Sequence, residues 1–378
     1  MKLLAWGANT YGQLGVGYKS ELCAEPVEVT APTIEPKLLT RLCGGGGHTL
    51  ILDKNGNIYS CGWNNKGQLG QSLEEQAASF EHIAALSGHH IIDISCGWET
   101  SFALTRDGKL FGWGSNVYGQ LSLPRDQVTF SASPLQLTDH KVKQLSSGLR
   151  HTAVVTDQGD VFVCGSGRKG QLGIVHHGQP LKESYTLQHV PGLPQIKMVA
   201  CGQHHTVALS VCGKIFVWGD NKFGQLGFDP LLHHNFAYPI QLDCSERESL
   251  PQECLLSCGW THTVLRTGGG KIVNWGRNNY GQLGCAEKQR LESWKPTFLN
   301  DVPSTKQIAV GSEHNVALSE NGEVLCWGWN EHGSCATGAD VDVKSPRKVE
   351  NAQKAALIGT GGAHSFAVVM TVRRRGNF

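Results

Sequence analysis

The sequence lacks a dominant charge of either sign. Its 33 Lys and Arg residues are balanced by 32 Asp and Glu residues. Proteins that bind the phosphates of nucleic acid gather Lys and Arg on one face, whereas the only basic run here is Arg373-Arg374-Arg375. We interpret this run as a solvated tail and expect no nucleic-acid partner; docking to histones or DNA is not favoured.

Long hydrophobic runs are also missing. No apolar stretch approaches the roughly 20 residues that a membrane helix needs, and Leu3-Leu4-Ala5-Trp6 is too short for the core of a signal peptide. We therefore expect no membrane insertion and an intracellular protein.

Cysteine is present, but the cysteines are not spaced as they are in metal-binding or redox-active motifs. The thirteen cysteines are an odd number and include no Cys-x-x-Cys pair, so neither a zinc ribbon nor a redox dithiol is supported. Several stand at repeated positions, which indicates small buried side chains and not a disulfide framework. We expect no bound metal.

Motifs for covalent catalysis or nucleotide binding are absent. There is no Gly-x-Ser-x-Gly elbow and no phosphate-binding Gly-x-x-x-x-Gly-Lys-Ser/Thr loop; Gly268-Gly269-Gly270-Lys271 has the wrong spacing and predicts a hairpin turn. We expect neither a cofactor nor bond-making chemistry.

What the sequence does contain is a repeat. The stretch WGRNNYGQLG at 275–284 has near copies beginning at Trp6, Cys61, Trp113, Cys164, Trp218 and, in degraded form, Trp327. A Gly-x-x-His motif followed by an apolar run alternates with it. This second motif begins at Gly45, Gly148, Gly202, Gly259, Gly311 and Gly361, and a seventh copy at Gly97 has Thr100 in place of the His. Self-similarity at one period predicts a repeat architecture.

Each repeat predicts about four strands. In the unit that starts at Gly202, residues 205–209 and 215–218 form two apolar runs around a turn at 211–214, and the longer connecting segment supplies one or two more. Seven copies predict an all-β, seven-bladed propeller of roughly 51–57-residue repeats spanning 1–378 as one domain, with 371–378 as a short tail. Because the chain begins with one motif and ends with the other, residues 3–7 should pair with 364–370 to close the ring.

The recurring side chains have structural interpretations. The repeated Trp residues should pack between blades, and the repeated Asn residues should bond turn backbone. The repeat His residues are distributed one per blade around a ring, so they cannot converge on a metal; we expect them to be buried and hydrogen-bonded.

Two coupled motifs at this period resemble the regulator of chromosome condensation repeat family, over essentially the whole chain. The turns around Gly44–His48, Cys96-Gly97-Trp98, Gly148–His151, Gly259–His262 and Gly311–Asn315, and the stretch 327–333, are most similar to the secretion-regulating exchange factors within it. The resemblance implies a cytoplasmic protein, present also in the nucleus, that acts on a small GTPase or on secretory and trafficking proteins.

Function should lie on loops of one face, because the scaffold allows residues to vary there. All seven Gly-x-x-His turns should open at the same end of the ring. The partner-binding candidates within them are Trp98, Glu99, Arg150, Gln203, His204, Trp260, Thr261 and Glu313. Exposed Trp and Arg are frequent interface anchors, although Trp98 and Trp260 could equally serve as packing over the blade edges.

The family's best-known activities do not transfer residue by residue. In its exchange factor for the nuclear-transport GTPase, the second and third turns supply acids and the fifth a His, where this chain has Trp98, Arg150 and Thr261. The family's plant ultraviolet photoreceptor uses consecutive Gly-Trp-Arg-His turns, which this chain lacks, so light sensing is not expected.

Two functions stay open. One is guanine nucleotide exchange on a small GTPase, achieved by binding the nucleotide-free state more tightly. The alternative is a non-catalytic adaptor for secretory-pathway proteins that uses the same face. We expect a monomer, and segment 228–258 is either a second partner surface or a solvated loop.

Overall fold

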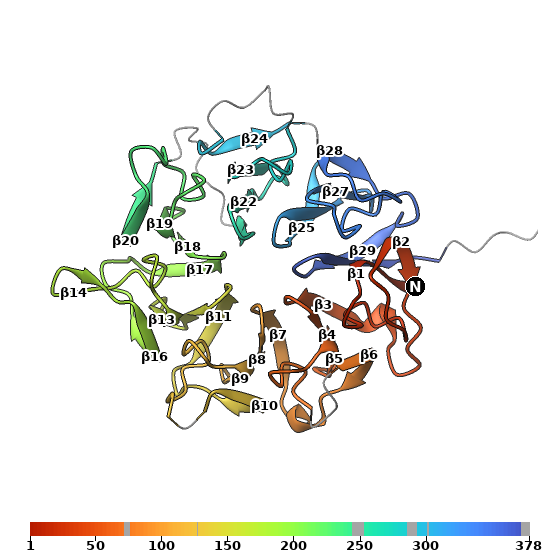
Figure 1. The fold of residues 1–378 in the computed structure, drawn as a ribbon, viewed down its shortest axis with the longest axis horizontal. Coiled ribbons are helices and arrows are strands. Elements are labelled where there is room, and N and C mark those ends of the chain that lie inside the picture. The colour runs from red at the N-terminus through yellow and green to blue at the C-terminus, as the bar shows by residue number, and fades with distance from the viewer. Residues whose placement is uncertain (72–75, 127, 244–252, 286–292, 301, 372–378) are drawn as a thin grey trace, which may run out of the picture.

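The computed structural model describes residues 1–71, 76–126, 128–243, 253–285, 293–300 and 302–371. In this part of the chain the strands form seven four-stranded antiparallel blades around a central opening (Figure 1). The predicted seven-bladed propeller is therefore confirmed.

Blades 1 to 3 follow one another in the chain, each running from an inner to an outer strand. Blade 1 consists of β3 (Leu39–Gly44), β4 (His48–Asp53), β5 (Ile58–Trp63) and β6 (Gln76–His82). Blade 2 consists of β7 (Ile91–Cys96), β8 (Thr100–Thr105), β9 (Leu110–Ser115) and β10 (Phe130–Gln136). Blade 3 consists of β11 (Val142–Ser147), β12 (His151–Thr156), β13 (Val161–Ser166) and β16 (Glu183–His189), with a small hairpin of β14 (Val175–His176) and β15 (Gln179–Pro180) in its outer loop.

Blades 4 to 6 repeat the pattern. Blade 4 consists of β17 (Ile196–Cys201), β18 (His205–Ser210), β19 (Ile215–Asp220) and β20 (Asn235–Leu242). Blade 5 consists of β21 (Leu255–Cys258), β22 (His262–Arg266), β23 (Ile272–Gly276) and β24 (Thr297–Leu299). Blade 6 consists of β25 (Thr305–Val310), β26 (His314–Ser319), β27 (Val324–Gly328) and β28 (Val343–Lys348).

Blade 7 joins the two ends of the chain, as the sequence predicts. Its strands are β29 (Ala355–Thr360), β30 (His364–Val369), β1 (Lys2–Ala8) and β2 (Leu22–Glu28). Strand β1 pairs antiparallel with β30 from Lys2 opposite Val369 to Gly7 opposite His364, and red and blue strands meet there in Figure 1. A single parallel bridge between Thr360 and Cys43 also joins blade 7 to blade 1.

The helical content of the described residues is two short segments, η1 (Pro36–Leu38) and η2 (Ala84–Leu86). No helix in this part of the chain is long and apolar enough to cross a membrane.

The repeated Trp residues pack between neighbouring blades, which confirms their predicted role. All five are fully buried, and each indole Nε1 donates a hydrogen bond to a backbone carbonyl of the preceding blade. The acceptors are Ser334 for Trp6, Gln68 for Trp113, Gln171 for Trp218, Gln225 for Trp275 and Gln282 for Trp327, at 2.8–3.0 Å. Where Cys replaces Trp, the thiols of Cys61 and Cys164 point at the equivalent carbonyls of Gln13 and Gln120, at 3.4 and 3.6 Å.

The repeat His residues link the blades and confirm the structural interpretation. Each Nε2 lies 2.9–3.2 Å from a side-chain oxygen of the next blade; the pairs are His48–Ser101, His151–Thr206, His205–Thr263, His262–Asn315, His314–Ser365 and His364–Thr49. The partner side chains already donate to a motif carbonyl, as Ser101 does to Gln68, so each His donates from Nε2. Burial lowers the pKa of His48 and His262 to about 4 and that of the other four to about 3.

Asn and Cys also behave as predicted in the described part of the chain. Each repeated Asn accepts the backbone N–H of the residue five positions later, as Asn9 does from Leu14 and Asn116 from Leu121, and the described cysteines are all free. The tail beyond 371 and residues 244–252 of segment 228–258 lie outside the described residues.

Candidate functional site

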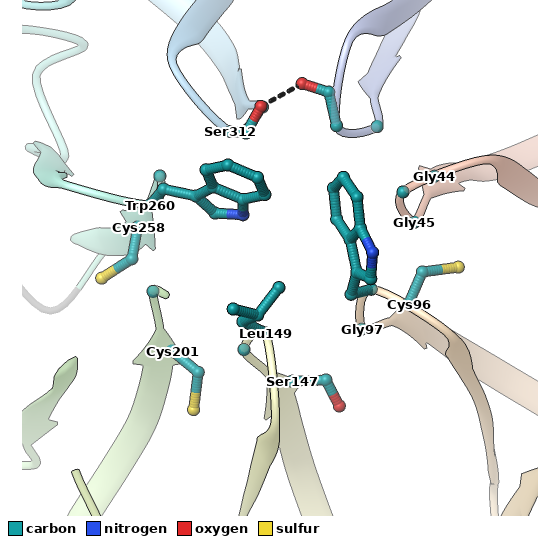
Figure 2. A pocket seen from close by; sticks show the side chains of 18 of the residues that line it. Gly44, Gly45, Cys96, Gly97, Ser147, Leu149, Cys201, Cys258, Trp260 and Ser312 are labelled. Carbon is teal, nitrogen blue, oxygen red and sulfur yellow. Dashed lines mark hydrogen bonds between the residues drawn. The ribbon is translucent and has the colours of Figure 1, made fainter. Parts of the chain in front are cut away.

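The seven Gly-x-x-His turns meet around the mouth of the central channel, at one end of the ring. Figure 2 shows this mouth, lined by turn residues such as Gly45, Gly97 and Leu149 and by small side chains such as Ser147 and Cys201. We call this end the Gly-x-x-His face. Because small residues line the channel wall, the face is hollow at its centre.

The Trp-Gly-x-Asn loops contribute to the same face. Within a blade, a backbone hydrogen bond joins loop and turn. The donor is the N–H of the residue after the first Gly of the loop, and the acceptor is the carbonyl of the residue before the His of the turn. Examples are Trp63 to Gly47, Asp220 to His204 and Arg277 to Thr261, at 2.8–2.9 Å. Turn and loop are therefore held together as one surface.

Backbone hydrogen bonds also run from turn to turn around the ring. The N–H of Gly46 donates to Trp98 O at 2.9 Å, and that of Trp260 donates to Ser312 O at 2.7 Å. The other links are Gln203 to Trp260, Ser312 to Gly362 and Gly362 to Gly45, at 2.9–3.2 Å. In the described part of the chain no such bond joins the turn of Leu149 and Arg150 to its neighbours, so this third turn is the least tied.

Trp98 and Trp260 meet across the channel mouth. They come from blades 2 and 5, yet their ring centroids are 5.0 Å apart with planes inclined by 52°. Both are half-buried, and Figure 2 shows Trp260 projecting into the opening above the channel. They pack against one another and still present surface to solvent.

Arg150, Gln203 and His204 lie on the neighbouring sector. Arg150 is exposed, and its guanidinium carbon lies 4.3 Å from the ring centroid of Tyr118. Gln203 and His204 are half-buried. Burial, together with the charges of Arg150 and Lys169 and against the opposing effect of Asp220, lowers the pKa of His204, so this sector carries its positive charge on Arg and Lys. Glu99 is half-buried beside Trp98.

Thr261 and Glu313, also predicted to contact a partner, are buried and bonded to each other. Thr261 Oγ1 donates to the Glu313 carboxylate at 2.7 Å, and Gln282 Nε2 donates to it at 2.6 Å. Burial raises the pKa of Glu313, against the opposing effect of those bonds and of Arg277. His262 Nδ1 lies 3.8 Å from Glu313, but because His262 is neutral this is no ion pair. Thr261 and Glu313 therefore lie beneath the surface of the Gly-x-x-His face and hold its turns and loops together.

Sequence reasoning missed the loop residues that share this face. Two positions of the first motif lie beside the turns: the one after the first Gly, with Trp63, Arg277 and Trp329, and the one before the second Gly, with Tyr11 and Tyr280. The periodic pattern contained the signal, because residues at these positions vary while their neighbours repeat. The sequence pattern did not show that these loops lie next to the turns in the folded protein.

No group of three His, Cys, Asp or Glu side chains among the described residues is placed to hold a metal ion. The site presents aromatic rings, a few charged side chains and turns joined by backbone hydrogen bonds.

Comparison with known proteins agrees with this arrangement. A family model for the RCC1-like domain matches residues 2–367. This chain belongs to the RCC1-like domain family. Two relatives of this RCC1-like protein, from Bos taurus and Mus musculus, are named as secretion-regulating guanine nucleotide exchange factors. The bovine (Bos taurus) secretion-regulating guanine nucleotide exchange factor is 33% identical over 97% of this chain and 82% of its own length.

Two further relatives show the breadth of the family. The Arabidopsis thaliana ultraviolet-B receptor UVR8 is 30% identical over 95% of this chain and 79% of its own length. Human (Homo sapiens) regulator of chromosome condensation is 28% identical over 97% of this chain and 90% of its own length. Among solved structures, Prp20p of Saccharomyces cerevisiae, described together with its binding to Gsp1p and histones, superposes with a TM-score of 0.84 at 24% identity, covering 97% of this RCC1-like chain and 90% of its own. At that identity the match shows the fold alone.

Proposed function

We propose that this RCC1-like protein regulates a small GTPase of secretion or membrane trafficking as a guanine nucleotide exchange factor, through the Gly-x-x-His face. The observation that carries the proposal is that the Trp98–Trp260 contact and the exposed Arg150 lie on turns of one face. The kinship with secretion-regulating exchange factors supports it.

The mechanism would be binding and not bond-making. A face that contacts the GTPase more tightly without nucleotide shifts the equilibrium toward that state, by as much as the two affinities differ. Trp98, Trp260 and Arg150 would anchor the partner, with Glu99, Gln203 and His204 around them; Thr261 and Glu313 would keep the face in shape. We propose that the protein acts as a monomer in the cytoplasm and nucleus.

The test is release of a fluorescent guanine nucleotide from a panel of secretory-pathway and other small GTPases. The wild type should accelerate release from at least one of them. A variant carrying Trp98→Ala, Arg150→Ala, His204→Ala and Trp260→Ala should lose this effect. The matched control carries Val211→Ala and Lys214→Ala in the β18–β19 turn at the opposite end of blade 4, and should retain it.

If no GTPase responds while a secretory-pathway protein is bound through this face, the exchange proposal fails and the adaptor function takes its place. Binding that survives the fourfold substitution would place the partner elsewhere on the propeller.

A further inference from the structure

A second cavity lies beside the channel mouth on the Gly-x-x-His face. Its volume is about 360 Å³, and residues of blades 1, 2, 5, 6 and 7 line it. We call it the aromatic pocket, after the six Trp and Tyr rings in its wall: Tyr11, Trp63, Trp98, Trp260, Tyr280 and Trp329.

Glycine turns create the space for these rings. A Cβ on Gly46 would lie 2.6 Å from the indole of Trp98, and one on Gly47 would lie 2.8 Å from the ring of Tyr11. Blades 1 and 7 place only Gly46, Gly47, Gly362 and Ala363 at the variable turn positions. Rings from neighbouring elements therefore spread over a sector that has almost no side chains of its own.

The rings are held in place before any partner arrives. Tyr11 stacks on Trp63 with centroids 4.6 Å apart and planes 12° apart, and Trp98 packs on Trp260. Tyr280 lies 6.4 Å from Trp329, which has His332 edge-on at 5.1 Å. A pre-ordered wall lowers the entropic cost of binding.

The one arginine of the wall is already engaged. The guanidinium carbon of Arg277 lies 4.6 Å from the ring centroids of both Phe223 and Tyr280, and its Nη1 is 4.0 Å from the buried Glu313 carboxylate. Glu313 therefore offsets the charge of Arg277. The remaining acid, Glu331, is exposed at the rim.

The pocket thus combines electron-rich ring faces with the exposed carboxylate of Glu331, which makes no ion pair with another described residue. Ring faces and carboxylates both attract cations, and a guanidinium also stacks flat on Trp. We propose that the aromatic pocket binds a basic side chain, arginine or lysine, that projects from the partner protein. The inference rests on the proposed function for its setting, but the preference for a cation is a property of this chain alone.

The test uses small probes and no GTPase. The indole N–H signals of Trp98, Trp260 and Trp329 are followed by NMR while N-acetyl-arginine methylamide or the lysine analogue is added. The controls are the citrulline analogue, which has the shape of arginine without its charge, and the leucine analogue. We expect both basic probes to shift the three signals with millimolar affinity, and the neutral probes to bind at least about fivefold more weakly.

Variants locate the binding. Trp260→Ala should abolish the response of the remaining two signals, and Glu331→Gln should weaken binding about two- to fivefold without changing the melting temperature. Tyr238→Ala, an exposed aromatic on outer strand β20, should change nothing. Equal binding of citrulline or leucine, or no response below about 50 mM probe, would overturn the inference. Because no exchange is measured, the pocket can pass this test even if nucleotide release does not.

Discussion

Trp98 and Trp260 lie in contact although three blade interfaces separate them along one side of the ring and four along the other. No backbone hydrogen bond joins their turns directly in the described structure, so the side chains themselves bridge the channel mouth. This contact is the structural centre of the face.

The two indoles should be energetically coupled. Trp98→Ala and Trp260→Ala should each lower the free energy of unfolding by about 1–2 kcal/mol, and the double variant should lose about 1 kcal/mol less than the sum. Urea denaturation of the four proteins measures the coupling. Strictly additive losses would mean that each ring is held by its own blade and not by the other.

Ring closure should depend on Gly7. This residue has φ +102°, and a Cβ there would lie 2.5 Å from the carbonyl oxygen of Ala363 in the turn before β30. Gly7→Ala should cost about 3 kcal/mol and speed amide exchange in β1. The matched control is Gly17→Ala, with φ +89° and no neighbour closer than 3.9 Å, which should cost only about 1–2 kcal/mol. Equal losses in thermal denaturation would contradict this account.

Acid should destabilise the fold through the six buried repeat His residues. Their pKa values of about 3–4 lie below the ordinary 6.5, so between these values the unfolded chain binds more protons and stability falls as pH falls below 6.5. At pH 5 each such His costs about 2 kcal/mol relative to neutral pH. The raised pKa of Glu313 acts in the opposite direction, but it is one group against six.

Melting temperatures from pH 8 to pH 4.5 measure this dependence. The wild type should show a steep loss below pH 6.5. His314→Gln should be less stable at pH 8 but lose stability less steeply, whereas His90→Gln, at an exposed position, should follow the wild-type slope. A wild-type melting temperature that does not change with pH would show that the six repeat His residues take up protons while the protein is folded.

Ser122 and Cys164 should depend on each other. In blades 1, 3 and 5 the last Gly of the first motif packs against the Trp of the next blade: a Cβ on Gly70 would lie 2.8 Å from Trp113 Nε1. Blade 2 has Ser122 at that position, at φ +56°, and blade 3 has Cys164 in place of Trp. Cys164→Trp alone should cost about 3 kcal/mol through overpacking, and adding Ser122→Gly should recover part of the loss. Denaturation midpoints that the second change leaves unaltered would refute the dependence.

The repeat allowed most of the fold to be predicted. Motif spacing specified the number of blades, the strand positions and the pairing of β1 with β30, because these follow from period and chain order. The packing of Gly70 against Trp113 could not be predicted in this way, since it depends on which atoms meet across a blade interface.

The candidate site was predicted less completely. The Gly-x-x-His turns identify the face, but exposure depends on contacts between blades. Thr261 and Glu313 occupy variable positions and are nevertheless buried: Gln282 and Arg277 of the adjacent loop reach Glu313, and Thr261 donates to the same carboxylate. Conversely, Trp63 and Trp329 have no turn motif to mark them, and only the folded loop brings them to the aromatic pocket.

The composition of blade 7 has a consequence during synthesis. Strand β1 is synthesised before blades 1 to 6 and its partner β30 after them, whereas each of those six blades forms from one continuous segment. The six can assemble as they emerge, but Leu3 and Trp6, fully buried in the finished ring, stay without their final packing until β30 has been made. Closure therefore waits for β30, and a nascent or truncated chain without β30 exposes apolar surface that chaperones and proteases can recognise.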